Sequence, residues 1–173
     1  MVGHLRAVKD PLLAARAAAL LPSSSRVRIV HIGAALEPEY ERLARETMRA
    51  NPRYRWLGPL ARRATLLRIA TSHALALTSR SEGGANVVAE AVMAGTPLLA
   101  TRIDGTLGQL GTEYAGYFEV GDELALAKLM ERLEHQPEFY RRLLEQGAAL
   151  RPRFEPARER DAWRQVLTEL RVL

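Results

Sequence analysis

The sequence predicts an α/β domain built on a doubly wound, Rossmann-like parallel sheet of about six strands, with helices on both faces. Short apolar segments rich in branched residues alternate with amphipathic segments along the whole chain, and Gly or Pro punctuates most boundaries. The length of 173 residues corresponds to about one domain, so we expect residues 1–173 to form a single domain. The 47% content of hydrophobic residues excludes a disordered chain.

The first part of the chain is predicted to contain four strands and three helices. Asp10-Pro11 is interpreted as the N-cap and first turn of the first helix, which ends at Pro22. The next strand is rich in branched residues and ends at Gly33, and the helix after it has an apolar side. The expected strands are 2–5, 26–32, 54–57 and 74–78, and the expected helices are 12–21, 37–50 and 62–72.

The second part of the chain continues the alternation. Gly95 and Pro97 mark the end of a helix over 86–94. The glycines at 105, 108 and 111 predict a loop after the fifth strand, and Trp163 begins an apolar stripe interpreted as ordinary packing of the last helix. The expected strands are 98–101 and 117–120, and the further helices are 123–133, 138–149 and 157–170.

Two segments are predicted to face each other at the centre of the sheet. Right-handed crossovers favour the strand order 3-2-1-4-5-6, in which the first and fourth strands are neighbours. Residues 3–9 include the end of the first strand and the residues after it, and residues 79–86 follow the fourth strand. Ligands of doubly wound sheets bind beyond the carboxyl ends of the strands at this switch point, so we expect the binding site there.

The segment SRSEGGANVVAEAVMAG at 79–95 has the features of an anion site. A glycine turn before a helix N-terminus lets the backbone approach a ligand and presents free N–H groups. Asn86 and Glu90 share one helix face, where Glu90 is suited to accept hydrogen bonds from ribose hydroxyls, and Glu82 and Asn86 from sugar hydroxyls. The alternative is a plain tight turn with Glu82 near the helix dipole and Glu90 on the surface.

Composition limits the classes of function. The net charge of +5 and pI of about 10.1 suit a small polyanion such as a nucleotide diphosphate, while the absence of a basic run with interleaved aromatic residues argues against nucleic acid as a partner. The chain has no cysteine and no HxH, HExxH or His/acid cluster, so no metal is expected. His31 is expected to be a satisfied core or rim histidine.

Membrane and export signals are not expected either. No apolar run approaches the roughly 20 residues that span a bilayer. The first residues lack the charged, apolar and cleavage regions of a secretory signal. These observations predict a cytoplasmic protein without a transmembrane segment.

Four segments, in order, resemble GT-B glycosyltransferases of the family-4 type. SEGGANVVAEAVMAGTPLLAT is similar to the E-x7-E region of that family, VGHLRAVKDP to its V-G-R-L-x-x-x-K-G segment, YRWLGPL to its V-x-F-L-G-x-V strand and loop, and YFEVGD to its V-x-P-G-D segment. The resemblance covers nearly the whole chain. It implies the C-terminal, donor-binding domain of a two-domain enzyme, with an N-terminal GT-B domain as partner.

The resemblance also implies residue roles in the first segment. Lys9 would bind the donor diphosphate. His4 stands where the family usually has a phosphate-binding arginine, and Arg6 is the expected substitute.

The later segments carry the remaining implied roles. Glu82 is the candidate catalytic residue through its hold on the donor sugar, and Gly84 replaces the usual Phe, which implies a different sugar pocket. Glu90 would hold the ribose. The other residues expected to contact the donor are Gly58 and Leu60 beside the base, and Gly83, Gly84, Asn86 and Val87 around the sugar and distal phosphate.

The implied reaction is transfer of a sugar from a UDP-linked donor, with the nucleotide sugar as substrate and no separate cofactor. H-L-R-x-V-K-D-P and E-G-G-A-N-V-V are also similar to selenosugar synthases, whose acceptor is selenophosphate. In this family the last helix commonly crosses onto the other domain, and we expect the isolated chain to be inactive. The alternative is a non-catalytic nucleotide-sugar-binding or regulatory module that acts through a partner protein.

Overall fold

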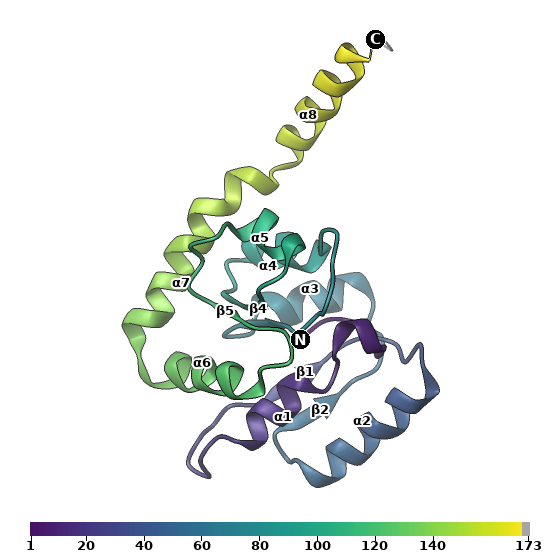
Figure 1. Cartoon of the computed structure of the whole chain (residues 1–173), viewed down its shortest axis with the longest axis vertical. Coiled ribbons are helices and arrows are strands. Elements are labelled where there is room, and N and C mark those ends of the chain that lie inside the picture. The colour runs from purple at the N-terminus through teal and green to yellow at the C-terminus, as the bar shows by residue number, and fades with distance from the viewer. Residues whose placement is uncertain (171–173) are drawn as a thin grey trace.

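The computed structural model describes residues 1–170 and confirms the α/β class (Figure 1). The strands are β1 (Ile29–His31), β2 (Tyr54–Trp56), β3 (Leu75–Leu77), β4 (Leu98–Thr101) and β5 (Tyr117–Phe118). The helices are η1 (Ala7–Lys9), α1 (Leu13–Ala19), α2 (Pro38–Ala50), α3 (Arg62–Ala70), α4 (Asn86–Ala94), α5 (Asp104–Leu110), α6 (Glu123–His135), α7 (Pro137–Leu150), η2 (Arg151–Phe154) and α8 (Pro156–Glu169).

The strands form two parallel sheets instead of the single sheet that the sequence predicts. One sheet has the order β1-β2 and the other the order β3-β4-β5. The predicted first strand contributes only isolated parallel bridges, from Val2 to Ile32 and from Leu5 to Ala35. Within residues 1–170, no backbone hydrogen bond joins residues 2–5 to β3. The two sheets are linked just beyond the strand ends, where the Arg80 N–H donates to the Val8 carbonyl at 2.8 Å.

The core consists of apolar strands covered by helices that are rich in alanine. All four residues of β4 are buried, as expected for the centre of a parallel sheet. Five of the seven residues of α1 are buried, and four of its residues are fully or almost fully enclosed alanines that let α1 approach α6 closely. Helix α3 packs against α4.

His31 is the polar centre of the first sheet and confirms the expectation of a satisfied core histidine. Its side chain is 0% exposed, with Nδ1 2.9 Å from the Tyr54 hydroxyl and Nε2 3.0 Å from the Gly3 carbonyl. The carbonyl can only accept, so Nε2 carries the proton and Nδ1 accepts from Tyr54. Burial, with the nearby amino-terminal charge, lowers the pKa of His31 to about 4. The neutral His31 ring therefore links the N-terminal residue Gly3 to strands β1 and β2.

Two local predictions were wrong. Asp10 does not cap α1, whose N-cap is Leu12; it ends η1 in the left-handed conformation at φ 38°. Residues 104–110 form helix α5 and not a loop. The Thr106 hydroxyl donates to the Thr101 carbonyl at 2.6 Å and accepts from the Ile103 N–H, and these bonds hold the start of α5 although Gly105 and Gly108 weaken a helix.

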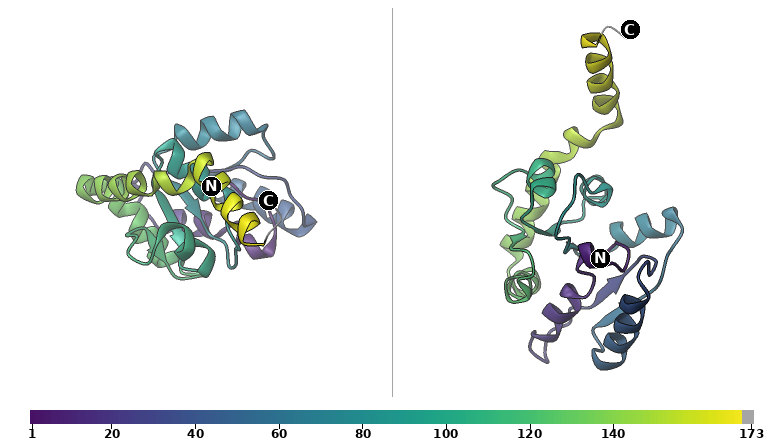
Figure 2. Two further views of the ribbon diagram at one scale, coloured as in Figure 1. Left: turned by 90° about the horizontal axis from the view of Figure 1, so that it is seen from above. Right: turned by 45° about the vertical axis from the view of Figure 1, so that its right-hand side comes forward.

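Helix α8 extends away from the body beyond η2, as Figures 1 and 2 show from different directions. Trp163 is 60% exposed, and Val166 and Leu170 are also exposed. Within residues 1–170 these side chains are exposed, so the prediction that the stripe packs against the domain was wrong. The predicted strand and helix over 117–120 and 157–170 are otherwise found, with ends shifted by a few residues at most.

Candidate functional site

The site predicted at the switch point is centred on an ion pair. Nζ of Lys9, the last residue of η1, contacts Oε1 of Glu82 in the turn before α4. The Ser79 hydroxyl donates to the same carboxylate oxygen at 2.6 Å. The Lys9 and Glu82 side chains are 18% and 12% exposed, so the pair is partly shielded from water. The two predicted segments thus meet, with one positive and one negative group side by side.

The turn that carries Glu82 is fixed by contacts from α5 and from the end of β4. A Cβ on Gly105 would overlap the Glu82 carbonyl, so α5 lies against the backbone of the turn at a distance that only glycine allows. The Gln109 side chain accepts from the Ala85 N–H at 3.1 Å and donates to the Ala85 carbonyl at 3.2 Å. The Thr101 hydroxyl donates to the Ser79 carbonyl at 2.6 Å. These contacts hold the turn in place.

The glycine turn and the start of α4 face solvent. Gly83 and Gly84 are exposed, and a Cβ on either would meet open space. Within residues 1–170 no side chain caps α4, so the Asn86 and Val87 amides at its start lack the partner that a capping side chain supplies, while the Val88 N–H donates to the Ala85 carbonyl. Asn86 is exposed, whereas Val87 and Glu90 are half-buried. The arrangement presents backbone N–H groups and the positive end of a helix dipole beside the Lys9–Glu82 pair.

The η1 side of the site is anchored through Asp10. Its buried carboxylate forms ion pairs with Arg80 at 2.8 Å and with Arg16 at 3.2 Å. The Thr78 hydroxyl lies 2.8 Å from the Lys9 carbonyl and 3.0 Å from the Asp10 carbonyl. The backbone around Lys9 is therefore tied to the end of β3, and the Lys9 side chain is presented from a fixed turn.

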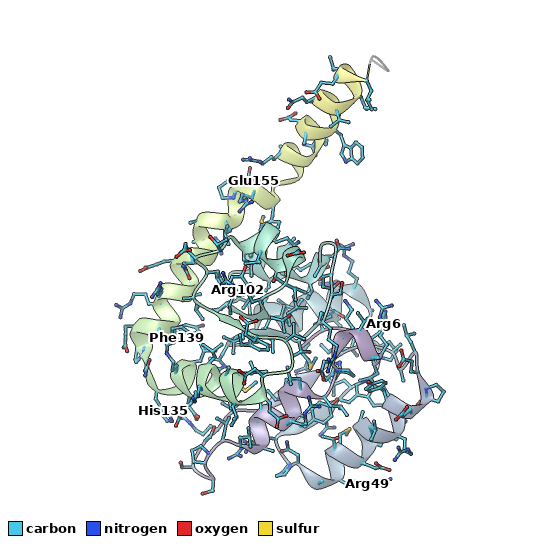
Figure 3. All side chains as sticks on the ribbon, in the orientation of Figure 1. Arg6, Arg49, Arg102, His135, Phe139 and Glu155 are labelled. Carbon is cyan, nitrogen blue, oxygen red and sulfur yellow. The ribbon has the colours of Figure 1, made fainter. Side chains whose placement is uncertain are left out.

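His4 and Arg6, the two other predicted phosphate ligands, are both exposed. Nδ1 of His4 accepts from the Ala34 N–H at 3.1 Å, so the ring is held with Nε2 as its available atom. Arg6 lies at the edge of the N-terminal segment (Figure 3) and makes no side-chain hydrogen bond to any other described residue. The Arg6 side chain is therefore less constrained by its neighbours than the His4 ring is.

The predicted base-contacting loop lies next to the first segment. Gly58 has φ +72°, and its carbonyl accepts from the Gly33 N–H at 3.0 Å. A Cβ on Gly33 would overlap the Gly3 carbonyl, so these backbones are in close contact. Leu60 is half-buried in the same loop. The loop at residues 58–60, the backbone at Gly3 and the end of β1 therefore lie side by side.

Sequence reasoning missed four residues that shape this site: Ser79, Gly105, Gln109 and Asp10. Ser79 and Gln109 have no motif that marks them from sequence, Asp10-Pro11 has the pattern of a helix start, and only the glycine at 105 signals a close backbone approach. Residues 1–170 contain no cluster of three or more His, Asp or Glu side chains suited to hold a metal. The arrangement can bind an anion beside a carboxylate.

Comparison with known families places the fold and the site in context. The family model described as "Glycosyl transferases group 1" matches residues 1–149. The chain belongs to the group 1 glycosyl transferases. The match covers the whole switch-point site and ends within α7, so the family assignment includes every predicted donor ligand.

Solved structures support the fold of this glycosyltransferase domain. Anabaena Alr3699/HepE in complex with UDP-glucose superposes with a TM-score of 0.84 at 21% identity, over 97% of this chain and 48% of that one. A glycosyltransferase from Rickettsia africae gives 0.85 at 15% identity, over 98% and 46%. A GtfA/B complex gives 0.74 at 22% identity, over 100% and 36%. The glycosyltransferase domain thus spans about half the length of the first two structures.

No curated protein matches the sequence. Among residues 1–170, no helix has both the length and the apolar character that crossing a bilayer requires.

Proposed function

We propose that this glycosyltransferase domain binds a UDP-sugar at the switch-point site and forms the donor-binding half of a sugar-transferring enzyme. The observation that carries the proposal is the meeting of Lys9 with Glu82 beside the open Gly83-Gly84 turn and the uncapped start of α4. This combination offers a cation and free N–H groups to a diphosphate and a carboxylate to sugar hydroxyls. The UDP-glucose complex of the structurally similar Alr3699/HepE supports the choice of donor.

In the proposed complex, the diphosphate lies over the glycine turn and the first turn of α4. Lys9 and Arg6 supply positive charge from the opposite segment. Glu90, one helical turn further, accepts hydrogen bonds from the ribose, and residues 58–60 cover the base. Asn86 and Val87 line the path between the sugar and the ribose.

Donor binding requires Lys9 to change partner. In the described state its ammonium is neutralised by Glu82. A diphosphate brings negative charge to the same place, so Lys9 moves to the phosphate, while Oε1 of Glu82 keeps the Ser79 hydrogen bond and Oε2, which neither Lys9 nor Ser79 contacts, is free. That oxygen accepts a hydrogen bond from the donor sugar. As the bond between sugar and diphosphate breaks, Lys9 and the helix N–H groups stabilise the departing diphosphate.

The second substrate and the second domain belong to the proposal as well. The chain spans about half of its structural neighbours, and we propose that an N-terminal GT-B domain supplies the acceptor site. The similarity of the HLRAVKDP and EGGANVV segments to selenosugar synthases makes selenophosphate the first acceptor to test.

Calorimetry with UDP-glucose, UDP and uridine tests donor binding. We expect UDP and UDP-glucose to bind and uridine to bind much more weakly, because it lacks the diphosphate. Equal affinity for all three would contradict the proposed phosphate site. Incubation of the chain with UDP-sugars and acceptors, selenophosphate included, should give no transfer without an N-terminal domain. A version linked to such a domain that binds donor but never transfers would favour the non-catalytic binding module.

A further inference from the structure

Asp10, the residue that follows Lys9, has a backbone conformation that glycine adopts most easily. Its φ is 38°, and among residues 1–170 it is the one non-glycine residue with a positive φ. It ends η1, where its N–H donates to the Ala7 carbonyl at 3.1 Å. The family segment V-G-R-L-x-x-x-K-G, which residues 2–10 resemble, has glycine at this place. The backbone thus gives no reason for an aspartate here, so the role of Asp10 lies in its carboxylate.

The Asp10 carboxylate joins two arginines from different parts of the chain. Nη2 of Arg80 lies 2.8 Å from Oδ2, and Nη2 of Arg16 lies 3.2 Å from Oδ1. The Asp10 side chain is 8% exposed, whereas both arginines are exposed. A carboxylate that is removed from water to this extent needs charged partners. The two arginines supply one such partner for each oxygen.

The ion pairs continue beyond Arg16 and form a row of alternating charges. Nε of Arg16 donates to Glu123, the first residue of α6, at 2.6 Å. Arg80, at the other end of the row, lies in the segment between β3 and the glycine turn. The row therefore connects α6 and α1 with the segment that carries the carboxylate of the proposed donor site. Asp10 lies within this row, and Lys9 is its neighbour in the chain.

The short helix η1, which carries Lys9, depends on polar contacts for its position. It has three residues, and none of them is buried. Its first amide, that of Ala7, donates to the Glu37 carboxylate at 3.2 Å. Its end is held by the Thr78 hydroxyl, 2.8 Å from the Lys9 carbonyl, and by the ion pairs of Asp10. The direction in which the Lys9 side chain leaves the backbone therefore depends on the Asp10 carboxylate.

We propose that Asp10 is a positioning residue for Lys9, which locks the end of η1 to Arg80 and Arg16 so that the Lys9 ammonium is held beside the glycine turn. This role rests on the proposed function, in which Lys9 binds the donor diphosphate. A lysine that is already held in place loses less conformational freedom when the diphosphate arrives. Asp10 thereby favours donor binding although its own charge is negative.

The sign of the effect on an anionic ligand distinguishes this role from that of a background charge. Removal of a carboxylate near an anion site strengthens anion binding when only its charge matters, because a repulsion is lost. Removal of a positioning residue weakens anion binding, because Lys9 then has to be ordered by the ligand. We expect the second effect to be larger at physiological salt, where the charges of the exposed Arg80 and Arg16 are screened.

The two lysines of the chain allow the position of Lys9 to be measured without any ligand. Lys9 and Lys128 are its only lysines, and Lys128 is exposed on α6. A short pulse of an acetylating N-hydroxysuccinimide ester labels both, and mass spectrometry gives the ratio of Lys9 to Lys128 labelling. Asp10→Gly suits the left-handed backbone but has no carboxylate. It is expected to raise this ratio roughly threefold, because Lys9 leaves the partly shielded pair with Glu82.

Asp10→Asn is the second variant, and Asp161→Asn is its matched control. Asparagine tolerates the left-handed conformation and keeps one side-chain oxygen, so it should raise the ratio less than glycine does. It also serves if the glycine variant fails to fold. Asp161 pairs with Arg164 at 3.1 Å on α8, and its replacement should leave the labelling ratio unchanged.

Calorimetry at about 0.15 M salt then measures UDP binding. Asp10→Gly is expected to weaken UDP roughly fivefold, and to cause no further loss when Lys9 is already alanine. An unchanged labelling ratio in both Asp10 variants would overturn the proposal. Tighter UDP binding by Asp10→Gly, or an equal loss in the Lys9→Ala background, would overturn it as well. A wild-type chain that binds no UDP would contradict the proposed donor site alone, because the labelling ratio still decides whether Asp10 holds Lys9.

Discussion

Nζ of Lys9 and Oε1 of Glu82 form an ion pair between residues that lie 73 positions apart in the sequence. The pair closes the switch-point site in the state described here. Any anionic ligand that uses Lys9 must compete with the Glu82 carboxylate, and any sugar hydroxyl that donates to Oε1 of Glu82 must compete with Lys9 and Ser79. The two side chains therefore respond to ligand together, and their variants are expected to have opposite effects on UDP.

Replacing Lys9 tests the cation of the pair. Lys9→Ala is expected to weaken UDP binding by roughly 1.5–3 kcal/mol, the contribution of a hydrogen bond to a charged group. Lys128→Ala is the matched control, because Lys128 is the other lysine of the chain and is exposed on α6. Calorimetry that finds the same UDP affinity in both variants would remove Lys9 from the site.

Replacing Glu82 tests the carboxylate. Glu82→Gln frees Lys9 and removes a negative charge next to the diphosphate, so UDP is expected to bind several-fold more tightly. The same change weakens the contact with sugar hydroxyls, so the affinity ratio of UDP-glucose to UDP should fall. The ratio is measured by calorimetry with both ligands. A loss of affinity for UDP alone would show that Glu82 supports the phosphate site instead of opposing it.

Glu90 is expected to act on the ribose and not on the phosphates. Glu90→Ala should weaken UDP by more than tenfold, while pyrophosphate, which lacks the ribose, should bind with nearly unchanged affinity. Glu131→Ala, an exposed glutamate of α6, serves as the control. Equal losses for UDP and pyrophosphate would mean that Glu90 acts through the fold, which thermal unfolding of the variant would reveal.

Substitutions at two glycines of α5 form a matched pair that tests how α5 supports the Glu82 turn. A Cβ at Gly105 overlaps the Glu82 carbonyl, whereas a Cβ at Gly108 meets open space. Gly105→Ala should therefore lower the free energy of unfolding by about 1–3 kcal/mol, as for other overpacked sites, and weaken UDP-glucose. Gly108→Ala should raise it by about 0.5–1 kcal/mol through helix propensity. Urea unfolding and calorimetry of both proteins measure the two effects, and similar results for the two variants would contradict this account.

Stability is expected to fall in mild acid because of two buried bases. The pKa of His31 falls from 6.5 to about 4 on folding, and that of the Met1 amino group from 8.0 to about 5. The unfolded chain binds more protons in these windows, so the free energy of unfolding decreases as the pH drops. For His31 the loss is roughly 2 kcal/mol between pH 7.5 and pH 5.

Urea unfolding across that pH range measures the slope. His31→Asn should remove the part that belongs to the imidazole, and acetylation of the amino terminus should remove the part that belongs to Met1. A wild-type stability that stays flat from pH 7.5 to pH 5 would show that neither group is held neutral by the fold.

Much of the fold was predictable because local signals and tertiary structure agree. Helix α4 and strand β4 have the predicted ends, since Gly95 adopts the left-handed conformation at φ +76° that ends a helix and Pro97 prevents its continuation. The facing of residues 3–9 and 79–86 was also found, because the switch point follows from right-handed crossovers alone.

Other features depend on contacts that are distant in sequence. Asp10-Pro11 has the local pattern of a helix start, but the Asp10 carboxylate pairs with the Arg16 and Arg80 side chains instead of capping α1. The glycines of α5 indicate a loop locally, yet Gly105 serves the close approach to Glu82 inside a helix. The gap between the sheets was not predictable, because periodicity identifies strands without showing which of their edges are paired. The roles of the predicted donor ligands stay predictions.

Helix α8 extends from η2 (Arg151–Phe154), so a small rotation at η2 moves the far end of α8 by a larger distance. Fourteen residues at 1.5 Å each make this helix about 21 Å long. A rotation of about 10° at residues 151–154 therefore displaces the far end by about 4 Å over that length, while the matched family region before it stays in place. Arg151 contacts the Val92 carbonyl of α4 at 3.3 Å, so η2 contacts the helix whose other end forms the proposed donor site.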